Sequence, residues 1–256
     1  MYNFFVDNEN KGNGRYLICG SDYNHIINVL RMNLGDEFLV SCDGKSDLCY
    51  IESLENETVT AKIIEENYRN TELNTKIYLF QGLPKSDKME LIIQKCVELG
   101  VEGIIPVEMN RCVVKLEEKK KASKQARWQA IAESAAKQSK RNSIPEVFEI
   151  MSYNNAVSMA KKLDLFLVPY ENKDGMLSTI QALKELNRCK SIGIFIGPEG
   201  GFEQNEIDKA IENGGKTISL GKRILRTETA AITSVALCML HIEMNENGEN
   251  NETASR

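Results

Sequence analysis

The stretch from Ile192 to Thr229 constrains the fold more than any other part of the chain. An apolar run typical of a buried strand leads through the Gly-rich turn at 197–201 into a polar helical segment, and a second short strand leads through a basic turn at 220–226 into another helix. Because strand, helix and strand follow in this order, the stretch predicts a βαβ unit and a parallel sheet. Loops at the carboxyl ends of such strands converge on a ligand crevice, so both turns are candidate ligand-binding loops.

The same alternation continues upstream of this stretch. The pattern predicts strands at 76–81, 103–107 and 165–168, and helices after Pro84 and at 117–141, 154–162 and 177–186. The turn at 168–171 leaves a strand end as the turn at 197–201 does, which makes it a third candidate loop. The last helix, expected at 228–244, is apolar nearly all the way round. We therefore expect it to be buried in the core or against a second subunit.

The amino-terminal part has a different pattern. Residues 2–66 contain short β-type runs separated by turn signals such as Asp43-Gly44, with one helical segment beginning near Ser21, and this predicts a small β-barrel. The polar segment 67–74 interrupts the pattern and predicts a domain boundary. We expect a barrel at 1–70, an α/β domain at 71–245 and a disordered tail at 246–256.

Composition excludes several classes of protein. The 256 residues contain no apolar run of about 18 residues that could span a membrane. The first residues lack the basic flank and apolar core of a signal peptide, so we expect a cytoplasmic protein. Seven cysteines without a CxxC motif indicate reduced thiols, and only two histidines argue against a metal site.

Charge leaves a nucleic-acid partner open. The net charge of −5 argues mildly against one, but residues 119–141 hold eight basic side chains and a single acidic one, Glu133. A charge run on a helix is commonly only a solvated face. Contact with RNA or DNA is the competing interpretation.

Common nucleotide motifs do not match. No GxGxxG fingerprint is present, and Gly215-Lys216-Thr217 is not the end of a P-loop because the required earlier glycine is Ala210. Glu199 places a carboxylate where a pyrophosphate would lie, and like charges repel. A nucleoside without a pyrophosphate suits the turn at 197–201 better. A tight strand-to-helix connection without any ligand is the other interpretation.

Several segments together resemble one enzyme family. IGPEGGF at 196–202 and LGKRILRTETAA at 220–231 resemble the signature of the SPOUT-class methyltransferases that methylate N3 of a uridine in 16S ribosomal RNA. The resemblance covers nearly the whole chain and includes HIINVLRM at 25–32, CDG at 42–44, KSDKMELIIQKCVELG at 85–100, Asn110-Arg111-Cys112 and QSKRNSIPE at 138–146. It implies a PUA-like amino-terminal barrel and a SPOUT-type α/β domain with a parallel sheet and a trefoil knot. It also implies S-adenosylmethionine as methyl donor, 16S rRNA in the 30S subunit as substrate, and a homodimer through the carboxyl-terminal domain.

The resemblance also implies where the donor binds. Its adenine and methionine parts would be held mostly by backbone groups of the three loops, at Leu167, Pro169, Gly197, Glu199, Gly200, Leu220, Gly221, Ile224, Leu225 and Arg226. One position departs from the family, which often has a basic residue just before the aromatic pair. This chain has Asn3 there, which puts an RNA role for that position in doubt.

Methylation of uridine N3 requires removal of the imide proton and stabilisation of the resulting charge. We expect Arg226 to orient the base and stabilise the negative charge on its carbonyl oxygen. Glu228 would assist proton removal, hold Arg226 or cap the helix, and these roles stay open. N3 takes part in base pairing, so the target must be unpaired or flipped out. We expect RNA contacts from a set of basic side chains: His25, Arg31, Lys85, Lys88, Arg111 and Arg141.

Pattern alone gives each of these cations another interpretation. Lys85 and Lys88 could serve only solubility, and His25 and Arg31 could be solvated residues near helix ends. Two other classes of function also remain. An oxidoreductase would need the phosphate cradle that the chain lacks, and a non-catalytic RNA-binding protein could keep a donor pocket without turnover.

Overall fold

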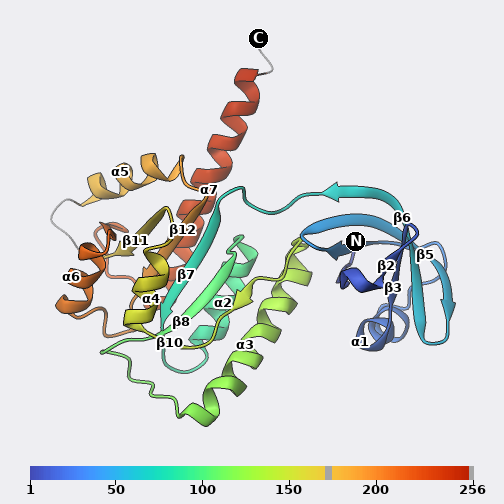
Figure 1. Ribbon diagram of the computed structural model, residues 1–256, viewed down its shortest axis with the longest axis horizontal. Helices are drawn as coiled ribbons and strands as arrows, with labels where there is room; N and C mark the ends of the chain where they lie inside the picture. Colours follow the sequence, from blue (N-terminus) through green and yellow to red (C-terminus); the bar gives the residue numbers. More distant parts are fainter. Residues whose placement is uncertain (171–174, 254–256) are drawn as a thin grey trace. The chain divides into compact units, whose positions relative to one another are not determined.

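The computed structural model describes residues 1–170 and 175–253, with side chains described up to residue 245 (Figure 1). The chain forms two compact units, one of residues 1–72 with 134–144 and the other of residues 73–133 with 145–256. Helix α3 (Glu118–Ser139) therefore begins in the second unit and ends in the first. The first division lies close to the boundary expected at 70, whereas the return of 134–144 to the amino-terminal unit was not expected.

The amino-terminal unit is built on a six-stranded sheet with the order β1-β4-β5-β6-β3-β2, in which only the β1–β4 pair is parallel. Its strands are β1 (Asn3–Phe5), β2 (Lys11–Gly12), β3 (Arg15–Ile18), β4 (Glu37–Cys42), β5 (Lys45–Glu55) and β6 (Thr58–Arg69). Its short helical segments are η1 (Asn8–Asn10), α1 (Gly20–Asn24) and the π-helical η2 (His25–Val29). Helix α1 begins at Gly20, one residue before the expected Ser21. Alternating apolar residues such as Phe4, Phe38 and Ile51 pack with Ile26 of η2 into the core.

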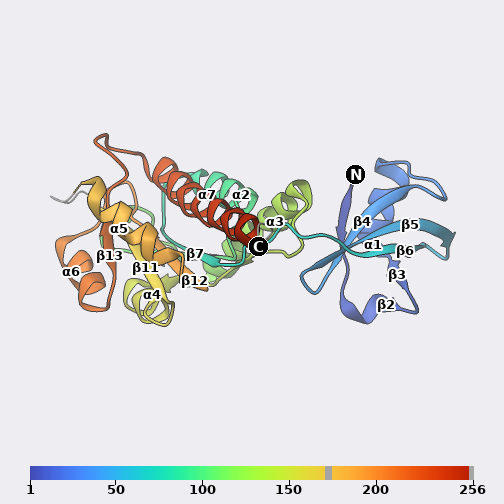
Figure 2. The same ribbon diagram turned by 90° about the horizontal axis from the view of Figure 1, so that it is seen from above.

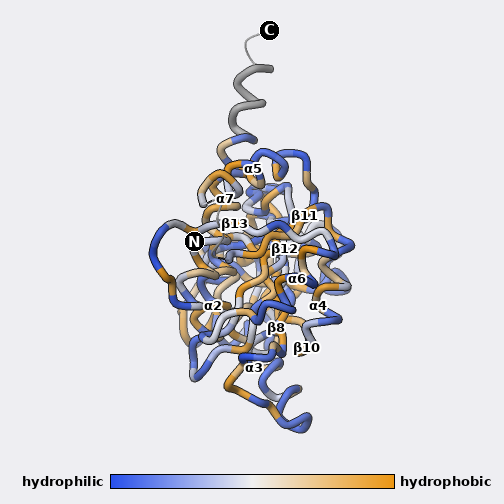
Figure 3. The backbone as a smooth tube through the Cα atoms, turned by 90° about the vertical axis from the view of Figure 1, so that its left-hand side faces the viewer, coloured by the Kyte–Doolittle hydropathy of each residue, from blue (hydrophilic) through white to orange (hydrophobic). Residues whose placement is uncertain are grey.

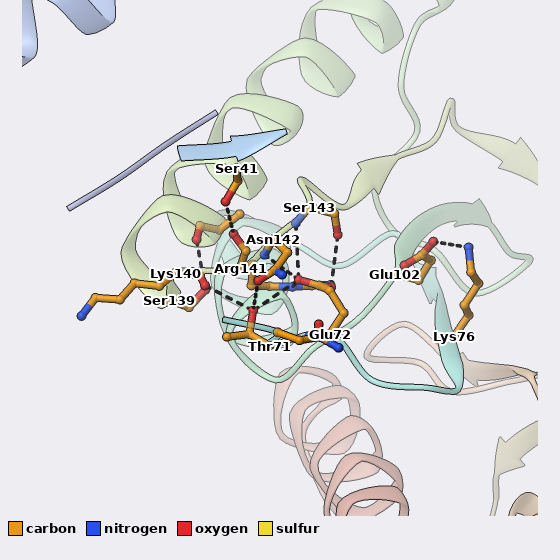
Figure 4. Close-up of polar contacts among 12 residues, drawn as sticks. Ser41, Thr71, Glu72, Lys76, Glu102, Ser139, Lys140, Arg141, Asn142 and Ser143 are labelled. Carbon is orange, nitrogen blue, oxygen red and sulfur yellow. Dashed lines mark hydrogen bonds and ion pairs between the residues drawn. The ribbon is translucent and has the colours of Figure 1, made fainter. Parts of the chain in front are cut away.

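Residues 141–143 are bound through Glu72 to the segment that follows β6 (Figure 4). Arg141 is only 3% exposed and forms an ion pair with Glu72, which also accepts a hydrogen bond from the backbone N–H of Asn142 at 2.7 Å. Partial burial opposes ionisation of Glu72, but these bonds outweigh it and lower the pKa of the carboxyl group. Asn3 Nδ2 donates to the carbonyl oxygen of Arg141 at 2.9 Å. The buried Asn3 is therefore a structural residue, which explains why an amide suits this position.

The second unit contains a parallel sheet with the order β10-β8-β7-β12-β11-β13, and β9 pairs with β8. Its strands are β7 (Lys76–Gly82), β8 (Gly103–Glu108), β9 (Glu146–Val147), β10 (Met151–Ser152), β11 (Leu165–Pro169), β12 (Ser191–Ile196) and β13 (Lys216–Ile218). The central strands are continuous apolar runs, as expected for strands covered on both faces. The structure thus confirms the expected α/β class with a parallel sheet.

Helices cover both faces of this sheet. They are α2 (Lys88–Glu98), the first part of α3, α4 (Tyr153–Ala160), α5 (Met176–Leu186), α6 (Gln204–Glu212) and α7 (Thr227–Thr253). In Figure 2, α2 and α7 lie on one face and α4 and α6 on the other. The core includes the stacked rings of Phe80 and Phe195, whose centroids are 4.5 Å apart. Figure 3 shows hydrophobic colour along β8 and β12 in the middle of the unit.

Helix α7 is buried along one side only. Ala231, Val235 and Cys238 face the core, while Leu240 is 47% and Met244 68% exposed. The expected burial on all sides is therefore not found within the described chain. The helix extends to Thr253, so the described part of the expected disordered tail is helical, and residues 254–256 lie outside the described residues.

Two chemical features follow from the described residues. None of their helices has the length and apolar character needed to cross a membrane. All seven cysteines are free thiols, and burial raises the pKa of several of them, including Cys96 and Cys238.

Candidate functional site

The carboxyl ends of four parallel strands lie in one row. Gln81 at the end of β7 is level with Ile196 of β12, and Pro169 of β11 is level with Ile218 of β13. Leu167 of β11 is paired with Ile194 of β12, and these two residues lie two positions before Pro169 and Ile196 in their strands. The ends of β11 and β12 are therefore also in line. The loops after Gly82, Pro169, Ile196 and Ile218 therefore leave the sheet at the same edge. The sequence-predicted loops are brought together as expected, except that Glu171 of the turn at 168–171 lies outside the described residues.

The turn at 197–201 is packed closely against its neighbours. A Cβ atom on Gly200 would lie 2.9 Å from the Cβ of Arg111, and Gly201 has a φ of +68°. The Arg111 guanidinium donates from Nη1 to the carbonyl oxygen of Gly200 at 3.1 Å. Arg111, expected on RNA, is exposed but already bound to the turn. The carbonyl oxygen of Gly200 is therefore already occupied, and a donor held by this turn would use its other backbone groups.

Lys88 joins two carboxylates at this edge. Its Nζ lies 3.0 Å from Glu199 Oε1 and 3.4 Å from Glu228 Oε2. Glu199 also accepts a hydrogen bond from the backbone N–H of Lys85 at 3.0 Å. Partial burial opposes ionisation of Glu199, but the hydrogen bonds from Lys88 and Lys85 prevail and lower its pKa. The hydrogen bond to Glu199 likewise raises the pKa of Lys88. The side chain of Glu199 is thus occupied at the start of α2.

The basic loop between β13 and α7 is anchored at its start and open at its end. Thr179 on α5 accepts from the backbone N–H of Ser219 at 3.0 Å and donates to its carbonyl oxygen at 2.7 Å. Further along, Leu220 and Leu225 are half-buried, Gly221 is exposed, and Ile224 is 98% exposed. Arg226 is exposed at the amino-terminal end of α7, and among the described residues nothing hydrogen-bonds or pairs with its guanidinium. A free cation therefore lies beside the candidate donor loops.

A buried pair of polar residues ties α7 to the turn at 197–201. Thr227 Oγ1 donates to the carbonyl oxygen of Gly197 at 2.7 Å and accepts from Gln81 Nε2 at 3.0 Å. Gln81 is fully buried and Thr227 is 6% exposed. We did not identify this pair in the sequence. The signal was present, since Gln81 is a polar residue at the end of an apolar strand and Thr227 directly precedes an expected helix.

The remaining predicted RNA contacts differ in their surroundings. His25 and Arg31 are exposed, and so is Lys85. Arg141 is buried against Glu72, so its guanidinium is not available to RNA, and the expectation for this residue is corrected. Much of the basic run at 119–141 is also paired with carboxylates, as in Lys121 with Glu108 and Arg127 with Glu90. Two further cations, Lys222 and Arg223, are exposed in the loop next to Arg226 and were not among the predicted RNA contacts.

The described site offers backbone groups, the exposed guanidinium of Arg226 and paired carboxylates. No cluster of three metal-ligating side chains occurs among the residues that the structure describes. Positions 197, 200 and 201 carry no side chain, and a turn of this kind suits S-adenosylmethionine, which has no phosphate and therefore needs no phosphate cradle. The arrangement can therefore hold such a donor beside a cation that stabilises negative charge.

Comparison with known proteins agrees with this geometry. Residues 71–239 match the family model of the RNA methyltransferase domain, and residues 18–64 match that of the RNA methyltransferase PUA domain. The fold class expected from the resemblance, with a PUA-like domain before an α/β methyltransferase domain, is confirmed.

Relatives match over most of their length. The ribosomal RNA small subunit methyltransferase E of Bacillus subtilis is 40% identical over 90% of this chain and 91% of its own. The crystal structure of the Neisseria gonorrhoeae ribosomal RNA small subunit methyltransferase E, bound to S-adenosylmethionine, aligns with a TM-score of 0.77 and 32% identity over 93% of this chain and 96% of its own. A Legionella pneumophila methyltransferase with bound S-adenosylmethionine aligns with a TM-score of 0.79 and 31% identity over 93% and 97%. With a matched domain model, a 40% identical relative and the same fold, the chain belongs to the ribosomal RNA small subunit methyltransferase E family.

Proposed function

We propose that this protein transfers a methyl group from S-adenosylmethionine to N3 of a specific uridine in the 16S rRNA of the small ribosomal subunit. The observation that carries the proposal is the free guanidinium of Arg226 at the sheet edge where the three candidate donor loops meet. Family membership supports the RNA substrate. The uridine-N3 position rests on the resemblance of IGPEGGF and LGKRILRTETAA together with this cation.

The donor would be held by the loops after β11, β12 and β13. When bound, S-adenosylmethionine supplies a methyl group on a positively charged sulfur, which leaves with the electron pair of the broken carbon–sulfur bond. The chain's part is to orient the base, stabilise the charge left on its carbonyl oxygen when N3 loses its proton, and hold an acceptor for that proton. Arg226 suits the first two tasks and Glu228, two residues later, suits the third.

Exposed cations of both units would bind the phosphate backbone of the RNA. In the α/β unit these are Lys85, Lys222 and Arg223, and in the amino-terminal unit His25 and Arg31. Reversing their charges should reduce the slope of log affinity against log salt, because each neutralised phosphate contributes to that slope. An unchanged slope would contradict this assignment.

We also infer that the protein works as a homodimer through the carboxyl-terminal domain. The neighbouring helices α2 and α7 both expose large apolar side chains, namely Leu91, Leu240 and Met244. Exposed apolar side chains of this size favour contact with another protein surface. Light scattering should give twice the monomer mass, and a monomeric mass at micromolar concentration would contradict the inference.

One experiment tests the activity directly. The protein is incubated with methyl-labelled S-adenosylmethionine and 30S subunits that lack the modification, and the product is mapped by reverse transcription. A methyl group on N3 blocks base pairing, so the polymerase should stop at one uridine. Label on another base or another atom would contradict the uridine-N3 assignment. Donor binding without any methyl incorporation would favour a non-catalytic RNA-binding protein.

A further inference from the structure

Lys88 connects three segments that are far apart in the sequence. It is the first residue of α2, Glu199 lies in the turn after β12, and Glu228 lies in the first turn of α7. The lysine Nζ lies 3.0 Å from Glu199 Oε1 and 3.4 Å from Glu228 Oε2. One ammonium group is therefore shared between the candidate donor turn and the helix that carries Arg226.

The two carboxylates are held differently. Glu199 keeps a hydrogen bond from the backbone N–H of Lys85 whatever side chain is at position 88. The Oε2 atom of Glu228 is buried without a hydrogen bond, although its side chain is 14% exposed, and its contact with Lys88 is a charge interaction. Among the described side chains, Lys88 is the one cation that pairs with Glu228. Glu228 has no described contact with Arg226, so the structure gives no support to a role in holding that arginine.

Glu228 is mostly buried, and it shares Lys88 with a second carboxylate, Glu199. A cation between two carboxylates attracts each of them and screens their repulsion. Removing it would leave Glu199 anchored by the backbone but Glu228 without a partner. Lys88 is also half-buried and occupied by these contacts, which makes it a poor candidate for a phosphate contact.

We propose that Lys88 is a positioning residue for methyl transfer: it holds the Glu228 carboxylate in place in the first turn of α7, ready to accept the proton from uridine N3. This inference rests on the proposed function. The proton passes from N3 to the Glu228 carboxylate, which becomes a neutral carboxylic acid, while Lys88 keeps its own protons throughout. Lys88 acts through Glu228 and does not touch the substrate.

The first test compares single substitutions under single-turnover conditions with 30S subunits and saturating donor. Lys88→Met should lower the rate constant of methyl transfer roughly 10- to 100-fold, part of the factor that a positioned proton acceptor supplies, with the KM for RNA within about twofold of wild type. Lys88→Arg should recover most of the rate, since a guanidinium can also bridge two carboxylates. Lys95→Met removes a cation from the same helix that pairs only with Glu98 on the surface, and it should behave as wild type.

The second test is a double-mutant cycle. Glu228→Gln should slow transfer by a similar or larger factor, and adding Lys88→Met to it should cause little further loss, because the lysine then has no carboxylate to act through. Losses that multiply, or a Lys88→Met variant with a raised KM and an unchanged rate, would overturn the proposal. If Lys88→Met does not fold, Lys88→Gln completes the same cycle.

The two proposals can fail separately. A wild-type protein that places no methyl group on uridine N3 overturns the proposed function. A wild-type protein that does so while Lys88→Met retains its full rate overturns only the role of Lys88.

Discussion

Arg226 and Glu228 are two positions apart, yet the protein holds them in opposite ways. The guanidinium of Arg226 is exposed with no described partner, whereas Glu228 is largely buried next to Lys88. An exposed guanidinium stays hydrated in the free protein, so its charge costs little stability. Its attraction for negative charge becomes stronger when bound substrate excludes water from the site. This contrast matches two different roles. Arg226 would stabilise the charge that develops on the substrate, whereas Glu228 is already held by Lys88 before the substrate binds.

Arg226→Ala should abolish methyl transfer, with a loss of at least roughly 100-fold, because the charge on the base then lacks its stabilising group. Donor binding measured by calorimetry should persist, since that binding depends on backbone groups. Arg188→Ala removes an exposed arginine outside the site and should leave turnover unchanged. Near-normal turnover of Arg226→Ala would refute the assignment.

Gly200→Ala should weaken donor binding because the new methyl group would lie 2.9 Å from the Cβ of Arg111 and displace the turn. We expect a loss of roughly tenfold in donor affinity by calorimetry, a change of about 1.4 kcal/mol. Gly12→Ala adds the same group where nothing lies within 4 Å and should have no effect. Equal donor affinities for the two variants would show that the turn does not hold the donor.

Residues whose signal is local can be placed from the sequence. Arg226 and the turn at 197–201 follow strands and precede helices, and that order predicts a position at a sheet edge. Arg141 shows where this fails, because a basic residue in a basic run gives no sign that Glu72 neutralises it. Lys88 is a related case, since its two carboxylate partners come from segments far along the chain.

The element that most needs explanation is the start of α7. The first buried hydroxyl of the helix, on Thr227, links Gln81 at the end of β7 to the carbonyl oxygen of Gly197 at the end of β12. These bonds fix where the helix begins, and the position of Arg226 follows from it. Helix boundaries of this kind are poorly predicted from sequence because the partners that fix them belong to other elements.

Thr227→Val keeps the shape of the side chain but removes the hydroxyl that donates to the Gly197 carbonyl oxygen and accepts one of the two hydrogen bonds from the Gln81 amide. Buried polar groups left unpaired cost about 1–3 kcal/mol, so the free energy of unfolding in urea should fall by that amount. The rate of methyl transfer should fall as well, since α7 loses its fixed start. Thr229→Val, at an exposed position two residues along, should change neither quantity. A Thr227→Val variant as stable and active as wild type would contradict this role.

At the scale of the whole molecule, the chain runs from the first unit to the second and back through α3. The segment 134–144 belongs to the amino-terminal unit although it follows half of the α/β unit in the sequence. The polar break at 67–74 predicts a division there, but the return could not be predicted because it depends on contacts such as that between Asn3 and Arg141. The trefoil knot also stays a prediction.

Glu72→Gln should destabilise the protein by about 3 kcal/mol, because it removes the carboxylate that forms an ion pair with the buried Arg141. The pKa of Glu72 is lowered from 4.5, so wild type has this contribution above that pH and loses it as the pH falls through the lower folded-state value. Urea unfolding between about pH 3 and pH 7 should therefore show a weaker pH dependence for Glu72→Gln in the acidic range. Glu66→Gln, at an exposed carboxylate on β6, should reproduce the wild-type curve. Identical acid-range slopes for wild type and Glu72→Gln would contradict the assignment.

The pairing of β7 with β12 affects how the protein is made on the ribosome. Lys76 is level with Ser191, so one long edge of β7 has no partner until the chain has been synthesised past β12. At roughly 5–20 residues per second, that apolar edge stays open for several seconds or more during translation. Open strand edges associate readily with other chains, so nascent copies of this protein should be clients of ribosome-associated chaperones. The same pairing that brings Gln81 level with Ile196 makes the catalytic unit one of the last parts of the chain to become complete.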